Sequence, residues 1–270
     1  MTMAEYTLQQ DLDFALALAD KVDAFTLARY GANDLVVESK PDMTPVSDAD
    51  RGAEQLILAE LAAHRPGDSV LGEEFGVHGD SARRWVIDPI DGTKNFVRRV
   101  PVWATLIALL IDDEPVLGVI SAPAMTRRWH AATGLGAYVS EPGTVPGATA
   151  TRRLAVSSVS ALEDSSLSYA SLNGWKDAGK LDGLLELLGT AWRTRGYGDF
   201  LSYALVAEGA VDAAFEPELE LYDMAALVPV VREAGGRFTS VAGAEGCHGG
   251  NALASNGKLH EAILPYLNRS

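Results

Sequence analysis

The sequence predicts an α/β protein in which helices pack on layered β-sheets, and three observations lead to that fold class. Residues 7–64 carry two amphipathic helical patterns, residues 69–139 contain a series of short apolar strands, and the second half alternates strands with helices. Such alternation is typical of sheets covered by helices, because each element must bury one apolar face against a neighbouring layer. The chain has 270 residues, which is enough for one large domain or two small ones.

Two helices are predicted before the first strand. Residues 7–30 repeat apolar side chains at helical spacing, and Thr7 with Gln10 matches a capping box at the start. The second helix is predicted over 48–64, with Asp48 as its N-cap. The polar loop between these helices contains two prolines, and it is either a mobile flap over an active site or a surface connection.

The rest of the first half is predicted to hold strands. They are expected at 69–72, 85–88, 103–111, 116–122, 128–132 and 136–139. The last four form two antiparallel hairpins, because short turn sequences separate them. Residues 141–151 are mostly Pro, Gly, Thr and Ala, and they mark a predicted boundary between an N-terminal half, 1–145, and a C-terminal half, 146–270. We expect both halves to form one compact fold.

The second half alternates more regularly. Strands are expected at 154–156, 167–169, 193–197, 211–216, 237–239 and 252–254. Helices are expected at 175–188, 200–208, 222–234 and 258–267. Glycines follow two of the helices and provide suitable ends for them.

The composition excludes several classes of function. The formal net charge of −15 argues against nucleic-acid binding, which relies on basic patches. Cys247 is the only cysteine, so an intrachain disulfide and a cysteine-based zinc site are excluded, and a reducing cytoplasm is expected. The longest apolar run, 102–111, is far shorter than the roughly 20 residues that span a bilayer, and the N-terminus lacks a signal-peptide pattern. We therefore expect a cytoplasmic protein without membrane partners.

The stretch 85–96, WVIDPIDGTKNF, contains the residues best suited to chemistry. A strand is predicted to stop at the aspartate–proline pair, because proline lacks the N–H that a sheet ladder needs. Asp88, Asp91 and the free carbonyl of Ile90 are then expected to converge at the strand end. Carboxylate and carbonyl oxygens are the ligands that hard cations such as Mg²⁺ prefer.

The next two residues favour phosphate binding. Gly92 permits a tight turn, and Thr93 suits the first turn of a helix. The free N–H groups at a helix start attract phosphate. The stretch as a whole therefore predicts metal-assisted phosphate chemistry.

Each candidate acid also has an ordinary structural role. Glu73 could be a solvated strand end, and Asp88 and Asp91 could serve only the turn around the proline. Asp223 stands at the start of a predicted helix, where an aspartate commonly acts as N-cap, and Asp50 stands in the first turn of another. Spacing alone leaves these alternatives open.

Four segments, taken together, resemble the inositol monophosphatase-like family. They are Gly-Glu-Glu at 72–74, Asp-Pro-Ile-Asp-Gly-Thr-Lys-Asn-Phe at 88–96, Tyr-Asp-Met-Ala-Ala at 222–226 and Glu-Ala-Gly-Gly at 233–236. They occur in the family's order across nearly the whole chain, and the second is highly specific. Tyr222 departs from the family's usual tryptophan, but it keeps an aromatic ring before the last aspartate.

This resemblance implies Mg²⁺-dependent hydrolysis of phosphate monoesters by in-line attack of a metal-activated water. It also implies an alternating α/β/α/β/α sandwich of the inositol monophosphatase and fructose-bisphosphatase type, usually as a homodimer, with two to three Mg²⁺ ions per site. The implied ligands are Glu73, Asp88 and the Ile90 carbonyl for the first metal, and Asp88, Asp91 and Asp223 for the second.

The same resemblance assigns five further roles. Asp50, in company with Glu73, would help to position a third metal through water. The backbone N–H groups of Gly92 and Thr93 would bind phosphate, and the Thr93 hydroxyl would orient the attacking water. Lys40, in the polar loop, matches a loop lysine of the family and is a candidate substrate-binding residue.

The organic part of the ester is expected to contact the second half. Residues 195–200 and 206–223 resemble the histidinol-phosphate phosphatase branch of the family, which acts in histidine biosynthesis. That ester carries an ammonium group and an imidazole, which carboxylates at Asp199 and Glu216 could bind. Asp199 has an equally good alternative role as N-cap of the helix predicted to begin at residue 200.

Two other functions stay open at this point. The same chemistry could act on inositol phosphate, fructose bisphosphate or a nucleotide 3′-phosphate. A non-catalytic phosphoester-binding relative is a third reading. The retention of the whole acidic set argues against it, because a degenerate site would have lost at least one member.

Overall fold

The computed structural model describes residues 6–40, 45–144 and 147–269. Its helices are α1 (Leu8–Arg29), α2 (Asp48–His64), α3 (Thr93–Val97), α4 (Leu172–Asp177), α5 (Leu181–Thr190), α6 (Asp199–Ala207), α7 (Leu221–Met224), α8 (Leu227–Glu233) and α9 (His260–Leu267). A small hairpin pairs β1 (Val37–Ser39) with β2 (Pro45–Ser47). Among the described residues, no helix combines the length and the apolar character needed to cross a bilayer.

Two larger sheets contain the other strands. The eight-stranded sheet has the order β10-β9-β8-β7-β6-β5-β3-β4. Its strands are β3 (Ser69–Gly72), β4 (Gly76–His78), β5 (Arg83–Asp91), β6 (Ala104–Ile111), β7 (Glu114–Ala122), β8 (Arg127–Ala132), β9 (Gly136–Pro142) and β10 (Thr149–Arg153). The five-stranded sheet has the order β12-β11-β13-β15-β14. Its strands are β11 (Ser166–Tyr169), β12 (Arg193–Arg195), β13 (Ala213–Glu216), β14 (Arg237–Thr239) and β15 (Ala252–Ser255).

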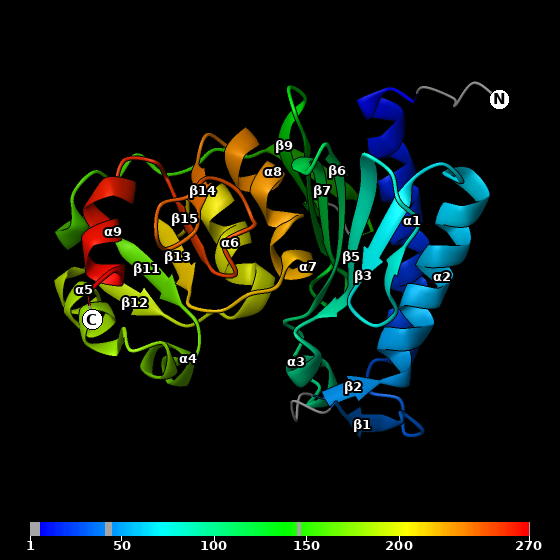
Figure 1. Ribbon diagram of the computed structural model, residues 1–270, viewed down its shortest axis with the longest axis horizontal. Helices are drawn as coiled ribbons and strands as arrows, with labels where there is room; N and C mark the ends of the chain where they lie inside the picture. The colour runs from blue at the N-terminus through cyan, green and yellow to red at the C-terminus, as the bar shows by residue number, and fades with distance from the viewer. Residues whose placement is uncertain (1–5, 41–44, 145–146, 270) are drawn as a thin grey trace.

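The elements form the layers α/β/α/β/α, as the resemblance implied (Figure 1). Helices α1 and α2 cover the outer face of the eight-stranded sheet, and α6 and α8 lie between the two sheets. Helices α4, α5 and α9 cover the outer face of the five-stranded sheet. Both predicted hairpins, β6–β7 and β8–β9, are present and antiparallel.

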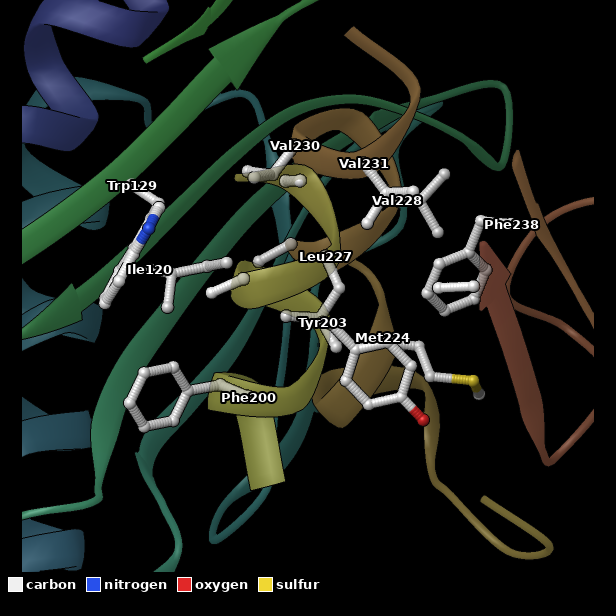
Figure 2. Close-up of a cluster of buried hydrophobic side chains, with 14 of the residues drawn as sticks. Ile120, Trp129, Phe200, Tyr203, Met224, Leu227, Val228, Val230, Val231 and Phe238 are labelled. Carbon is white, nitrogen blue, oxygen red and sulfur yellow. The ribbon is translucent and has the colours of Figure 1, made fainter. Parts of the chain in front are cut away.

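The middle layer has a core that both sheets share. Figure 2 shows Ile120 and Trp129 of the eight-stranded sheet facing Phe200 of α6, while Phe238 of β14 closes the cluster on the opposite side. All four side chains are buried. Burial of a side chain of this size contributes about 1.5–3 kcal/mol relative to an exposed one. Because one core serves both sheets, the two halves pack into a single body.

The first two helices match their predicted ranges closely, with one difference at a cap. Helix α1 begins with the predicted capping box of Thr7 and Gln10. Helix α2 is capped by Ser47 and not by Asp48, so that part of the prediction is wrong. Ser47 has the extended backbone that an N-cap needs, and its backbone N–H donates to the Asp50 carboxylate at 2.8 Å.

Two predicted helices are each divided in the structure. The range 175–188 contains the end of α4 and most of α5, and Gly179 with φ +69° lies at the break. The range 222–234 contains α7 and α8. Pro229 lacks the N–H that would bond to the carbonyl of residue 225, which separates the two short helices.

The centre of the chain also differs from expectation. No strand forms at 154–156, where only the Leu154 N–H bonds to the neighbouring strand, at Ala137. The boundary predicted between residues 145 and 146 lies outside the described residues. The segments on either side of it, β9 and β10, pair as neighbours in the eight-stranded sheet.

One glycine fixes the separation between the eight-stranded sheet and the middle helices. Gly118, in β7, faces the segment that joins α7 to α8, and a Cβ built on it would lie 2.1 Å from the carbonyl oxygen of Ala226. No side chain fits into that distance, so the backbone of β7 packs directly against the backbone that follows Asp223.

Candidate active site

A cavity of about 740 Å³ opens between the two halves of the molecule. The cavity is lined by every residue that the sequence analysis proposed for the site, except Asp50. These are Lys40, Glu73, Asp88, Ile90, Asp91, Gly92, Thr93, Asp199, Glu216 and Asp223. Residues up to 183 positions apart in the chain, Lys40 and Asp223, therefore surround one space.

Strand β5 brings the two central aspartates into this cavity. The strand continues past Asp88 to Asp91, so the predicted stop at the proline is wrong. Its pairing with β6 shifts between Asp88, opposite Leu106, and Asp91, opposite Ala104. This bulge takes the proline out of the ladder, so the missing N–H breaks no pairing bond. Residues three apart on a regular strand face opposite sides, and the bulge brings both aspartates to the same side.

Asp223 joins this pair from the other half of the chain. Asp88, Asp91 and Asp223 each offer a carboxylate oxygen within 4.8 Å of the others. Asp223 is not the N-cap of α7, because Glu220 occupies that position and its N–H donates to Asp223 Oδ2 at 2.7 Å. A carboxylate has two oxygens, so this capping bond leaves one free for the cluster.

Burial and mutual repulsion make this cluster unfavourable without a cation. Desolvation, followed by the charge of Glu73, raises the pKa of Asp88 well above its usual range. Desolvation also raises the pKa of Asp91 well above its usual range, and that of Asp223 to about 7. The donors are all oxygen atoms, with the Ile90 carbonyl beside them, which is the set that hard divalent cations prefer.

Glu73 approaches the cluster from the turn after β3. The turn is held by Glu54 of α2, whose carboxylate accepts hydrogen bonds from the N–H groups of Glu74 at 2.8 Å and Phe75 at 3.0 Å. Lys40 Nζ lies 2.7 Å from Glu73 Oε1 and 2.7 Å from Glu74 Oε1. Both residues lie in the turn and contact the same lysine, but only Glu73 lines the cavity. Glu54 had no functional signal in the sequence.

The polar loop around Lys40 is described only in part. The hairpin of β1 and β2 forms most of it, and residues 41–44 lie outside the described residues. The choice between a mobile flap and a surface connection, which the sequence left open, concerns a loop that includes this segment.

Thr93 stands between the cluster and Asp50. Its hydroxyl is 3.1 Å from both Asp50 Oδ1 and the Ile90 carbonyl oxygen. Asp50 is fully buried and also accepts hydrogen bonds from Ser47, so it acts behind the cavity wall. Gly92 has φ +85°, and a Cβ on it would lie 3.0 Å from the Val102 carbonyl oxygen. Glycine is therefore required where the chain turns into α3.

Asp199 and Glu216 face the cavity from the second half. Gly198 occupies the N-cap position of α6, so the capping alternative for Asp199 is not realised. Its carboxylate instead accepts a hydrogen bond from Asn95 Nδ2 at 2.8 Å, and burial raises its pKa. Glu216 ends β13, where desolvation raises its pKa to about 8. The positive charge of Lys94 partly opposes the rise in the pKa of Asp199.

Several residues of the cavity wall were not singled out from the sequence. Tyr203, Lys94, Leu219 and Ser171 all line the cavity. Tyr203 lies four residues after Asp199, one helical turn away on the same face, and this spacing was the available signal. It was missed because an aromatic residue in an apolar helix reads as part of the core.

The sandwich and its buried carboxylates define a class of layered α/β proteins with an acidic site, suited to metal ions, between two sheets. A family model described as "Inositol monophosphatase family" matches residues 7–270. The chain therefore belongs to the inositol monophosphatase family, which confirms the resemblance seen in its motifs.

Relatives support the same assignment. A histidinol-phosphatase of Streptomyces coelicolor is 57% identical over 263 residues, covering 96% of this chain and 97% of that one. A histidinol-phosphatase of Mycobacterium tuberculosis is 56% identical over 259 residues, covering 96% and 98%. Among solved structures, an IMPase of Thermotoga maritima superposes with a TM-score of 0.83 at 31% identity, covering 96% of each chain.

Proposed function

We propose that the protein hydrolyses histidinol phosphate to histidinol and inorganic phosphate. It is a phosphoric monoester hydrolase. The observation that carries the substrate assignment is the identity of 57% and 56% to two histidinol-phosphatases over nearly the full length of all three chains. The cavity adds a physical reason, because it places the buried carboxylates of Asp199 and Glu216 beside the metal-type cluster of Asp88, Asp91 and Asp223.

The cofactor we propose is Mg²⁺, with two to three ions per site. Glu73, Asp88, Asp91, Asp223 and the Ile90 carbonyl would hold two of them, and Asp50 would support a third through water. When bound, Mg²⁺ neutralises the phosphate oxygens and lowers the pKa of the attacking water.

The chain's own residues then orient the reaction. The Thr93 hydroxyl donates to Asp50, so its oxygen keeps a lone pair that can accept a hydrogen bond from the attacking water. The backbone N–H groups of Gly92 and Thr93, at the start of α3, would hold the phosphate oxygens. Water attacks phosphorus in line with the ester oxygen, the bond from phosphorus to that oxygen breaks, and the oxygen leaves with a proton as the alcohol.

Lys40 and the acids of the second half would bind the two ends of the substrate. Lys40 lies beside Glu73, where its ammonium group can also approach the phosphate. Asp199 and Glu216 would receive the ammonium group and the imidazole. Burial of an unpaired carboxylate is costly, and a cationic ligand removes that cost.

We also propose a cytoplasmic homodimer whose subunits have the halves 1–145 and 146–270. The single cysteine, Cys247, is buried, and this fits a reducing compartment. Native mass spectrometry of the purified protein tests the dimer directly.

The substrate is tested by phosphate release from histidinol phosphate, inositol 1-phosphate and fructose 1,6-bisphosphate, each with Mg²⁺ and with EDTA. We expect the highest kcat/KM for histidinol phosphate and no release with EDTA. A preference for inositol 1-phosphate would reject the substrate and keep the mechanism. No release from any ester with Mg²⁺ would favour a non-catalytic relative.

Glu216→Gln tests the carboxylate that lies at the end of β13 in the cavity wall. A hydrogen bond to a charged group is worth about 1.5–3 kcal/mol, so kcat/KM for histidinol phosphate should fall roughly 10- to 100-fold. Hydrolysis of p-nitrophenyl phosphate, which has no cationic group, should change little. Glu163→Gln is the matched control, because Glu163 is exposed and does not line the cavity. Equal losses on both esters would remove Glu216 from the substrate role.

A further inference from the structure

We propose that Tyr203 is a specificity-determining residue, whose hydroxyl acts with Glu216 to receive the nitrogen-bearing end of the substrate, a role that rests on the proposed function. The hydroxyl is buried at the cavity wall, and no described residue forms a hydrogen bond with it. Neither the sequence motifs nor the metal-type cluster uses this residue.

The tyrosine ring has an ordinary structural role, but its hydroxyl does not. The side chain is 1% exposed and belongs to the central core, with its ring centroid 5.8 Å from that of Phe238. Phenylalanine would fill the same space. A buried hydroxyl without a partner lowers stability, because it has lost its hydrogen bonds to water and gained none in return. Packing therefore explains the ring and leaves the oxygen unexplained.

The hydroxyl points away from the apolar side chains around it and lies near Glu216 (Figure 2). Figure 2 shows the Tyr203 ring within the cluster and its oxygen directed away from Val228 and Val231. Asp199, Phe200 and Tyr203 all line the cavity from α6. Asp199 and Tyr203 are four residues apart, so their side chains lie on the same face of the helix.

Glu216 is the neighbour that gives this position its chemistry. The Tyr203 hydroxyl lies close enough to Glu216 that the carboxylate contributes, after burial, to raising the pKa of the phenol. The two groups nevertheless form no hydrogen bond of normal geometry. The cavity thus presents a hydroxyl and a carboxylate side by side, both with unused hydrogen-bonding capacity.

A cationic nitrogen group can form hydrogen bonds with both the Tyr203 hydroxyl and the Glu216 carboxylate. An ammonium or imidazolium N–H can donate to the phenolic oxygen and to the carboxylate, while the phenolic proton turns toward Glu216. A neutral alcohol could fill the same hydrogen bonds, but it brings no positive charge to stabilise the ionised form of the buried carboxylate. The pair of Tyr203 and Glu216 therefore favours an amine-bearing ester over a polyol phosphate.

Tyr203→Phe separates this role from packing. We expect KM for histidinol phosphate to rise about tenfold with kcat within about twofold, because the lost contact is to the nitrogen-bearing end of the ester and not to its phosphate. The kcat/KM for p-nitrophenyl phosphate should stay unchanged. The melting temperature should stay equal or rise, because the variant removes a buried hydroxyl that had no partner.

The control is Tyr138→Phe, which removes a hydroxyl from β9, where the ring stacks on His130 outside the cavity wall. This variant should leave the kinetic constants for both histidinol phosphate and p-nitrophenyl phosphate unchanged. If Tyr203→Phe lowers the melting temperature and both activities together, the hydroxyl is structural and the inference is overturned. If wild-type protein prefers histidinol phosphate and Tyr203→Phe keeps its KM, the inference alone fails. If wild-type protein prefers inositol 1-phosphate, the proposed substrate fails and the inference fails with it.

Discussion

Asp88→Asn is expected to lower kcat/KM for every phosphate ester by about 10³-fold or more. Asp88 is the central acid of the cluster, next to Glu73 on one side and to Asp91 and Asp223 on the other. An amide keeps the shape of the side chain and loses the negative charge that holds a cation. Metal ions contribute several kcal/mol to such reactions, and each 1.4 kcal/mol corresponds to a factor of ten in rate.

The same variant should make the metal-free protein more stable. Repulsion and burial raise the pKa of Asp88, so removing its charge relieves an unfavourable interaction. Asparagine Oδ1 can still accept the hydrogen bond from the Ile90 N–H, which measures 2.9 Å. Higher stability with lost activity excludes misfolding as the cause. Activity within tenfold of wild type would show that Asp88 is not a metal ligand.

Saturating Mg²⁺ is expected to raise the melting temperature by roughly 5–10 °C relative to EDTA. A ligand at 100 times its Kd stabilises the folded state by about 2.7 kcal/mol, and a chain of this size gains about 2–4 °C per kcal/mol. Thermal unfolding followed by circular dichroism measures the shift. Sodium chloride at equal ionic strength is the control, because general screening would also reduce the repulsion. An unchanged melting temperature would contradict the metal site.

The size of this stabilisation should depend on pH. In the unfolded chain the aspartates ionise near their usual pKa of about 4. In the folded, metal-free protein the pKa of Asp223 is raised to about 7, and those of Asp88 and Asp91 are raised well above their usual range. Between about pH 4 and about pH 7 the folded state therefore binds more protons than the unfolded state. Its free energy of unfolding consequently falls as the pH rises from about 4 to about 7. Mg²⁺ should therefore stabilise the protein more at pH 8 than at pH 5.

The parts of the fold predicted well from sequence depend on neighbouring residues. The capping box of Thr7 and Gln10 needs only four residues, and α1 begins where it predicts. The hairpins β6–β7 and β8–β9 need only two apolar runs and a short turn. The order of layers came from family resemblance, because strand and helix alternation does not specify which sheet each strand joins.

The parts that escaped prediction depend on distant contacts. The bulge between Asp88 and Asp91 depends on the pairing of β5 with β6, whose register shifts between these two residues. Asp199 accepts a hydrogen bond from Asn95, 104 residues earlier, and no local pattern distinguishes that role from a helix cap. Tyr203 follows the apolar pattern of α6, and only the folded neighbourhood of Glu216 reveals that its hydroxyl lacks a partner.

The direct backbone contact at Gly118 has a consequence for how accurately the metal site must be built. Asp88 belongs to the eight-stranded sheet, whereas Asp223 belongs to the segment that packs on Gly118, three residues before Ala226. Their distance is therefore set by the spacing between two layers and not by any side chain in the cavity. A single methyl group at Gly118 would force the layers apart and carry Asp223 away from its partners. The distance between Asp88 and Asp223 thus depends on Gly118, a residue that contacts neither metal nor substrate.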